Sequence, residues 1–180
     1  MPLLITIPKS ELWDEKNQEF IEFEAKTLAL EHSLLSISKW ESKWKKPYLT
    51  NKSKSREEVI DYVRCMTISQ NVDSKIYYGL TNKNLKDIDE YIKDSMTATR
   101  FSNNPKKNNN EIITNELIYY WMSALSIPFS CDKWHLNRLL TLIEIANRKN
   151  QPPKKMSPEA VARRNQSLNK ARRAKHKSRG

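Results

Sequence analysis

The residues best placed to do chemistry are a cysteine and a histidine four positions apart, Cys131 and His135. Side chains at positions i and i+4 share one face of a helix, so the pair could supply two metal ligands, or a thiol and its base. No further ligand stands at a characteristic spacing, and an ordinary helix N-terminus is the commoner source of such a pair. We therefore predict no metal site and no cofactor.

The remaining composition also argues against catalysis. The chain has 180 residues but only two glycines, which nearly excludes a glycine-rich phosphate cradle, and it contains neither a P-loop nor a dinucleotide-binding motif. The other histidines, His32 and His176, have no repeated spacing to carboxylates or cysteines. The acidic residues form no recognisable dyad. The sequence therefore predicts that the protein is not an enzyme.

Cysteine usage and hydropathy bear on the compartment. Cys65 and Cys131 are the two cysteines, and the apolar run near the N-terminus is too short for a secretory signal. This combination favours a reducing compartment in which both thiols are free. No apolar run approaches membrane-spanning length. We expect a soluble intracellular protein that does not act in a membrane.

Positive charge is concentrated at the C-terminal end. Residues 154–180 contain ten lysines and arginines and one glutamate, a net charge of +9, which leaves +2 of the formal +11 for residues 1–153. Such a segment binds nucleic acid, an acidic protein segment or an anionic membrane, or it remains solvated, because charge gives the sign of a partner and not its identity. The residues predicted to bind a polyanion are Lys154, Lys155, Arg163, Arg164, Arg172, Arg173 and Lys175.

Apolar residues are densest in residues 111–149, around which we expect the chain to be organised. Thr114 caps a first helix, which Pro128 ends; Ser130 offers an N-cap to a second helix, with Asp132 in its first turn. The short break favours antiparallel neighbours. The second helix has an apolar surface wider than one face, which is either covered on two sides by the domain or open to a partner. Its residues are Leu136, Leu139, Leu140, Leu142 and Ile143.

The N-terminal region predicts a small β-ribbon lying on a helix. Residues 3–7 and 19–26 alternate in polarity and indicate two strands of a hairpin, joined by an excursion through residues 10–14; the apolar phase shifts at residues 27–30, where the strand bends or ends. The supporting helix is expected within residues 32–49, ended by Pro47, with Trp40 and Trp44 on one face. The two indoles either belong to the core, the commoner case, or bind a partner such as a stacked nucleic-acid strand.

Local signals place the remaining elements. Ser55 and Glu58 match a capping box for a helix reaching about residue 68, residues 73–79 indicate a short helix ending at Gly79, and Thr81 caps another helix. Residues 96–110 lack periodicity and are expected to form an exposed loop. Ser157 followed by Pro158 starts a tail helix that has little apolar surface to bury. The predicted fold is α+β and mostly α-helical, with a domain over residues 1–153 and a basic tail over residues 154–180.

Three segments carry a resemblance to a known group of proteins. HSLLSISKWESKWKKPYL (residues 32–49), EIITNELIYYWMSALSIPF (111–129) and KWHLNRLLTLI (133–143), in this order and ahead of a basic C-terminus, resemble small proteins of tailed bacteriophages that are classed with the tail assembly chaperones. The similarity extends over about residues 1–175. It is a similarity of pattern and includes no catalytic signature.

The resemblance implies a non-enzymatic protein of the infected host's cytoplasm. Such proteins bind the long helical tape measure protein, keep it from aggregating and help the other tail proteins to assemble around it. They are usually lost from the finished particle. Residue-level reasoning leaves two alternatives, a nucleic-acid-binding protein that uses the basic arm and a structural virion component of the neck or tail. Wide apolar stripes also make a homo-oligomer plausible.

Overall fold

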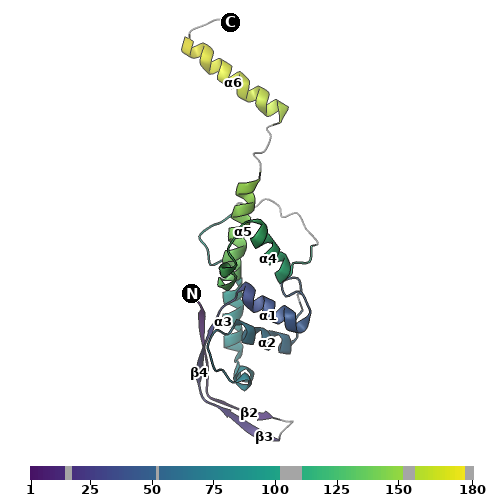
Figure 1. The fold of residues 1–180 in the computed structure, drawn as a ribbon. Coiled ribbons are helices and arrows are strands. Elements are labelled where there is room, and N and C mark those ends of the chain that lie inside the picture. The colour runs from purple at the N-terminus through teal and green to yellow at the C-terminus, as the bar shows by residue number, and fades with distance from the viewer. Residues whose placement is uncertain (15–17, 52, 102–110, 152–156, 177–180) are drawn as a thin grey trace. The chain divides into compact units, whose positions relative to one another are not determined.

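The computed structural model describes residues 1–14, 18–51, 53–101, 111–151 and 157–176. The chain is mostly helical, with short antiparallel strands at the N-terminal end packed against helices, which confirms the predicted fold class (Figure 1). Contacts divide the chain into two compact units, residues 1–147 and 148–180. The elements are β1 (Leu3–Ile7), β2 (Ser10–Asp14), β3 (Glu19–Phe23), β4 (Lys26–Leu30), α1 (Leu34–Trp44), α2 (Arg56–Met66), the 3₁₀ helix η1 (Ser74–Gly79), α3 (Asn82–Lys93), α4 (Asn115–Ala124), the 3₁₀ helix η2 (Phe129–Lys133), α5 (Leu136–Asn150) and α6 (Pro158–His176).

The strand pairing differs from the prediction. β1 pairs antiparallel with β4, with Leu3 opposite Leu30, whereas residues 19–23 pair with the supposed excursion, with Ser10 opposite Phe23. The apolar phase shift at residues 27–30 therefore marks a separate strand, because Leu28 and Leu30 turn the same buried face toward the helices as Ile5 and Ile7. β1 and β4 thus form the ribbon that packs on the helices, and β2 and β3 form the hairpin that connects them.

Gly79 lies close to the residues at the start of the β2–β3 hairpin. Gly79, at the end of η1, lies against the junction of β1 and β2, where a Cβ atom would stand 3.0 Å from Ser10 Oγ and 3.1 Å from Ile7 Cγ2. A larger residue here would require these two side chains to shift by a few tenths of an ångström. The glycine that sequence analysis placed at a helix end also allows a tight packing contact.

The helices α1 to α4 begin at capped residues, because a serine or threonine side chain accepts a hydrogen bond from a first-turn amide. Ser55, Thr81 and Thr114 cap α2, α3 and α4 as predicted, and Ser33 caps α1. α1 ends at Trp44, before the predicted stop at Pro47. The next residue, Lys45, adopts a left-handed conformation with φ of 54°. Local side-chain chemistry therefore sets most helix starts.

The connection between α4 and α5 is longer than predicted. α4 ends at Ala124, η2 follows Pro128, and α5 begins only at Leu136. Ser130 lies inside η2 and does not cap α5. At the observed start of α5, His135 Nδ1 accepts from the Asn137 amide at 3.3 Å, and the Leu136 amide donates to the backbone oxygen of His32 at 2.7 Å. A different local side chain and a long-range backbone contact thus bond the first amides of α5.

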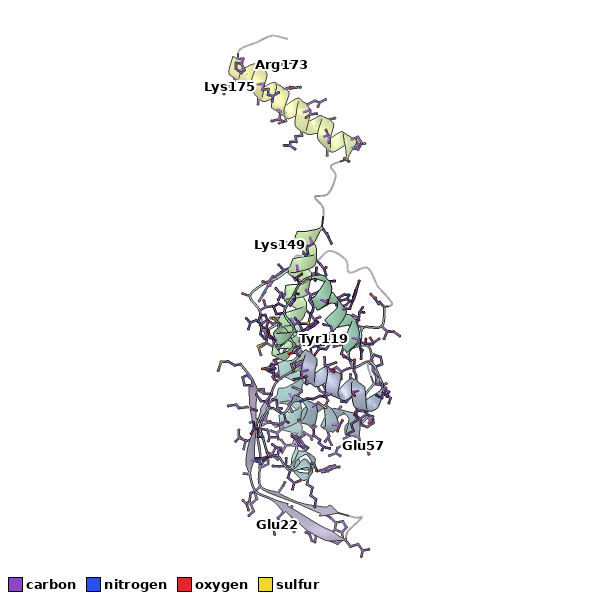
Figure 2. The ribbon with its side chains drawn as sticks, in the orientation of Figure 1. Glu22, Glu57, Tyr119, Lys149, Arg173 and Lys175 are labelled. Atoms are coloured by element: carbon purple, nitrogen blue, oxygen red, sulfur yellow. The ribbon has the colours of Figure 1, made fainter. Side chains whose placement is uncertain are left out.

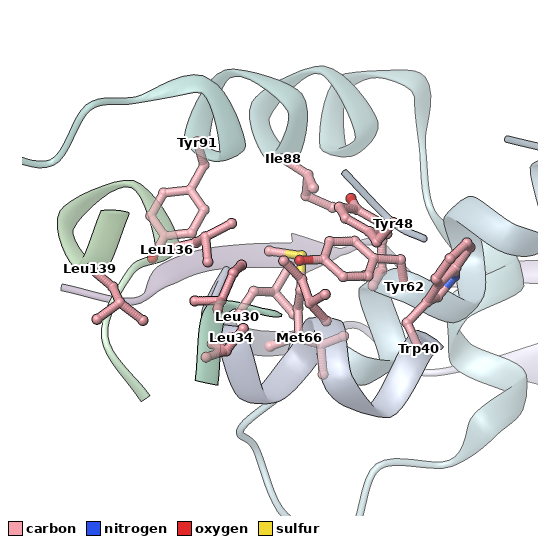
Figure 3. Close-up of a cluster of buried hydrophobic side chains, with 14 of the residues drawn as sticks. Leu30, Leu34, Trp40, Tyr48, Tyr62, Met66, Ile88, Tyr91, Leu136 and Leu139 are labelled. Atoms are coloured by element: carbon pink, nitrogen blue, oxygen red, sulfur yellow. The ribbon is translucent and has the colours of Figure 1, made fainter. Parts of the chain in front are cut away.

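The core is centred on α1 and not on residues 111–149. α1 packs against α2, α4 and η2, and its Leu34, Ile37 and Trp40 are completely buried. Figure 3 shows buried side chains of β4, α1, α2, α3 and α5 converging at this centre. They include Leu30, Leu34, Met66, Ile88, Leu136 and Leu139.

The two segments predicted to be least regular behave differently. Residues 96–101 contain no helix or strand, in line with the expected loop, whereas residues 102–110 lie outside the described residues. α6 forms as predicted, and the Ala160 amide donates to the capping Ser157 Oγ at 3.2 Å. No residue of α6 is buried.

Candidate functional site

The tryptophans predicted to bind a partner are held by the domain. Trp40 is 0% exposed, and its indole Nε1 donates to the Glu58 backbone oxygen at 2.9 Å. Trp44 is half-buried and donates to Asp61 Oδ2 at 2.9 Å, while Lys43 forms an ion pair with the same carboxylate. Trp40 therefore belongs to the core, and Asp61 pairs with both the Trp44 indole nitrogen and Lys43 on the face proposed for base stacking.

The apolar surface of α5 is largely covered. Leu136, Leu139 and Ile143 are buried, and Leu140 and Leu142 are half-buried against the core. The structure therefore covers Leu136, Leu139 and Ile143 within the domain and leaves Leu140 and Leu142 partly exposed.

The two histidines of the domain lie in contact at its centre. The rings of His32 and His135 are 5.2 Å apart, and His32 Nδ1 lies 2.5 Å from the Tyr62 hydroxyl group. Burial, with a smaller effect from His135, lowers the pKa of His32 to about 3; burial also lowers the pKa of His135. Both imidazoles are therefore neutral at neutral pH, and burial keeps them from solvent.

The Cys131 and His135 pair does not act as a ligand pair here. His135 Nε2 lies 3.1 Å from the Tyr91 backbone oxygen, which can only accept, and Nδ1 accepts from the Asn137 amide at 3.3 Å. Both ring nitrogens thus have backbone partners. Cys131 is buried, and among the described residues no group of three His, Cys, Asp or Glu side chains could hold a metal ion.

A surface hollow beside α1 and α2 is lined by basic side chains, and an acidic side chain in the same hollow offsets part of their positive charge. Its lining includes Lys39, Lys43 and Arg64, together with the carboxylate of Asp61. Lys43 pairs with Asp61, and an Arg64 nitrogen lies 3.7 Å from the same carboxylate. Burial raises the pKa of the Cys65 thiol in this hollow to about 11, so the thiol is not activated as a nucleophile.

The predicted polyanion-binding residues lie on an exposed helix. Arg163, Arg164, Arg172, Arg173 and Lys175 belong to α6 and are all exposed, whereas Lys154 and Lys155 lie outside the described residues. Figure 2 shows Arg173 and Lys175 near the C-terminal end of this helix. Helical spacing puts Arg163, Lys170 and Arg173 on one side, and Arg164, Arg172 and Lys175 on another. The helix therefore presents cations on more than one side.

Sequence reasoning missed one exposed surface, which we call the hairpin face: Glu11, Trp13, Phe20 and Glu22. Trp13 lies opposite Phe20 and Glu11 opposite Glu22 across β2 and β3, so all four side chains are on one side of the hairpin. The Trp13 and Phe20 rings meet edge to face at 4.8 Å, although these residues are 50% and 63% exposed. The alternation was visible in the sequence, but finding this face needed the pairing of residues 10–14 with 19–23.

Comparison with protein-family models, curated proteins and solved structures found no match to the chain. In the part of the chain that the structure describes, no helix is both long and apolar enough to cross a membrane.

Proposed function

We propose that this protein is a non-enzymatic tail assembly chaperone that binds the tape measure protein in the cytoplasm of the infected host. The observation that carries the proposal is α6: a helix of 19 residues, none of them buried and six of them lysine or arginine. A helix that buries nothing contributes little to a core, so its six cations are better explained by a partner.

The client contact is assigned to α6 because most residues of the two predicted apolar surfaces are buried in the domain, whereas no residue of α6 is buried. A long helical client presents rows of side chains three and four residues apart. The cations of α6 follow helical spacing as well, so they can pair with acidic rows along such a client. The resemblance of residues 32–49, 111–129 and 133–143 to the tail assembly chaperones supports the identity of that client. The helical domain then serves to carry α6.

Co-expression with the tape measure protein of the same phage tests this function. We expect the full chain to keep the client in solution and to co-elute with it on size exclusion after nuclease treatment. Reversing two charges with R172E/R173E should reduce the recovered complex at least tenfold. The matched control is R56E/K83E, which makes the same charge change at exposed first-turn positions of α2 and α3, where acidic residues are favourable.

Two results would contradict the proposal. One is an insoluble client and no complex with the unchanged chain. The other is equal loss of complex in R172E/R173E and in R56E/K83E, because net charge alone would then explain the binding.

Nucleic-acid binding is the second candidate, and the cations on more than one side of α6 favour it. A helix lying in a groove can reach phosphates on both sides, and the released counterions make the affinity fall steeply with salt. We expect a plot of log affinity against log salt concentration to have a slope of about −0.9 for each phosphate contacted. Binding to duplex DNA or RNA that is absent, or insensitive to salt between 50 and 200 mM, would exclude this candidate.

A further inference from the structure

The hairpin face combines an apolar centre with an acidic border. The Trp13 and Phe20 rings meet edge to face and remain at least half exposed. Glu11 and Glu22 stand directly opposite each other, two residues farther from the tip. Figure 2 labels Glu22 on this hairpin. Large aromatic side chains beside carboxylates make a surface suited to a ligand that is both apolar and cationic.

The acidic border is unfavourable in the protein alone. Like charges directly opposite each other on paired strands are destabilising. Lys9 forms an ion pair with Glu24 at 2.8 Å and has a weaker electrostatic interaction with Glu22, which offsets part of this repulsion. Residues 10–24 contain six acidic residues and one lysine, a net charge of −5. A bound cation between Glu11 and Glu22 would relieve this repulsion.

α6 carries the complementary pattern. Its two large exposed apolar residues, Val161 and Leu168, are seven positions apart and so share one side, and Arg172 follows Leu168 by four. Four helical residues rise about 6 Å. On the hairpin, two strand residues separate the aromatic pair from the acidic pair, about 6.8 Å. An apolar contact and an ion pair can therefore form together.

We propose that the hairpin face binds α6 of a second copy of this chain. Leu168 packs on the Trp13 and Phe20 rings, and the Arg172 guanidinium lies between the carboxylates of Glu11 and Glu22. Arginine suits this position because its planar group pairs with carboxylates and stacks on aromatic rings. The contact joins different surfaces of the two copies, so it forms either a reciprocal dimer or a head-to-tail chain. It goes beyond the chaperone function and concerns the protein without a client.

Sedimentation velocity of the nuclease-treated full chain tests the proposal. A contact this small predicts weak, concentration-dependent self-association, with a dissociation constant between about 1 μM and 1 mM. We expect the acidic-pair variant E11K/E22K and the helix variant L168A/R172E each to weaken self-association at least tenfold. A one-to-one mixture of the two variants should associate again, because each retains the surface that the other has lost.

Two controls separate docking from a general effect of charge. K170E changes a cation on the opposite side of α6 and should leave self-association within threefold of the unchanged chain. E90K/E111K reverses two exposed carboxylates away from the hairpin and should do the same.

The inference is overturned if the unchanged chain is monomeric up to about 1 mM, or if the mixed variants fail to associate while the unchanged chain does. It is also overturned if K170E is as damaging as L168A/R172E. Since no client is present, these outcomes leave the test of the chaperone function separate.

Discussion

Lowering the pH should destabilise the folded protein through His32, before most carboxylates are protonated. His32 is 2% exposed, and burial together with the neighbouring His135 lowers its pKa to about 3. In the unfolded chain a histidine titrates near pH 6.5. Between these two values the unfolded state binds a proton that the folded state does not, so the free energy of unfolding falls as the pH falls.

The size of the effect follows from the width of this window. Between pH 6.5 and 4.5, about 2 pH units, this single site lowers the free energy of unfolding by about 1.4 kcal/mol per unit, or about 3 kcal/mol in total. His135, whose pKa is also lowered, changes stability in the same direction. Hydrogen bonds from Lys46 and from the Ser55 amide lower the pKa of Glu58, so this carboxylate begins to lose its stabilising effect only below about 4.5. The window from pH 7 to 4.5 therefore reports mainly on the histidines.

Urea unfolding followed by circular dichroism at pH 7 and at pH 4.5 measures the effect. The unchanged chain should lose about 3 kcal/mol between the two pH values, whereas H32Q should lose at least 2 kcal/mol less, whatever its stability at pH 7. H176Q, which changes an exposed histidine on α6, is the matched control and should behave like the unchanged chain. If H32Q shows the same dependence on pH as the unchanged chain, His32 is not held neutral by burial and the reasoning fails.

Three further changes test how the domain is held together. The buried carboxylate of Glu41 accepts hydrogen bonds from the Tyr48 amide at 2.6 Å, from the Asn115 amide at 2.8 Å and from Asn115 Nδ2 at 2.6 Å. E41Q turns an amide group toward at least one of these donors and should cost about 2–3 kcal/mol in urea unfolding, whereas a loss below about 0.5 kcal/mol would contradict these contacts. T81A removes the side chain that caps α3 and should cost about 1 kcal/mol; T97A, in an irregular segment, is its control, and equal losses would refute the role of the cap. Deleting residues 157–180 removes no buried residue of α6 and should leave the thermal unfolding midpoint within about 2 °C, so that a larger drop would show that α6 supports the core.

Signals that act within a few residues predicted the structure best. Ser55, Thr81 and Thr114 cap helices as expected because the hydrogen bond joins a side chain to an amide two or three positions away. Ser130 carries the same signal but does not cap α5, because it lies inside η2 and α5 begins only at Leu136. A capping signal predicts the bond only where the helix starts directly after the capping residue.

The sequence did not show which strands pair or which apolar faces are covered. Alternation identified residues 3–7 and 19–26 as extended, but a period of two says nothing about which strand lies alongside, so β4 and the β2–β3 hairpin were missed. Helical spacing likewise put Trp40 and Leu139 on apolar faces without showing what covers them. Both residues are completely buried, so neither can contact a partner.

The bond between Leu136 and His32 also bears on the order of events during synthesis. It joins residues about a hundred positions apart, beside a core in which Leu34 packs with Leu136 and Leu139. At about 5–20 residues per second, the ribosome adds the stretch from the end of α3 to the start of α5 in roughly 2–8 s. Throughout that time the nascent chain contains the residues of the strands and first three helices but lacks α5, which buries part of their apolar surface. The core can be completed only after residue 136 has been added, and the translation speed through residues 94–136 sets how long this apolar surface is exposed to aggregation.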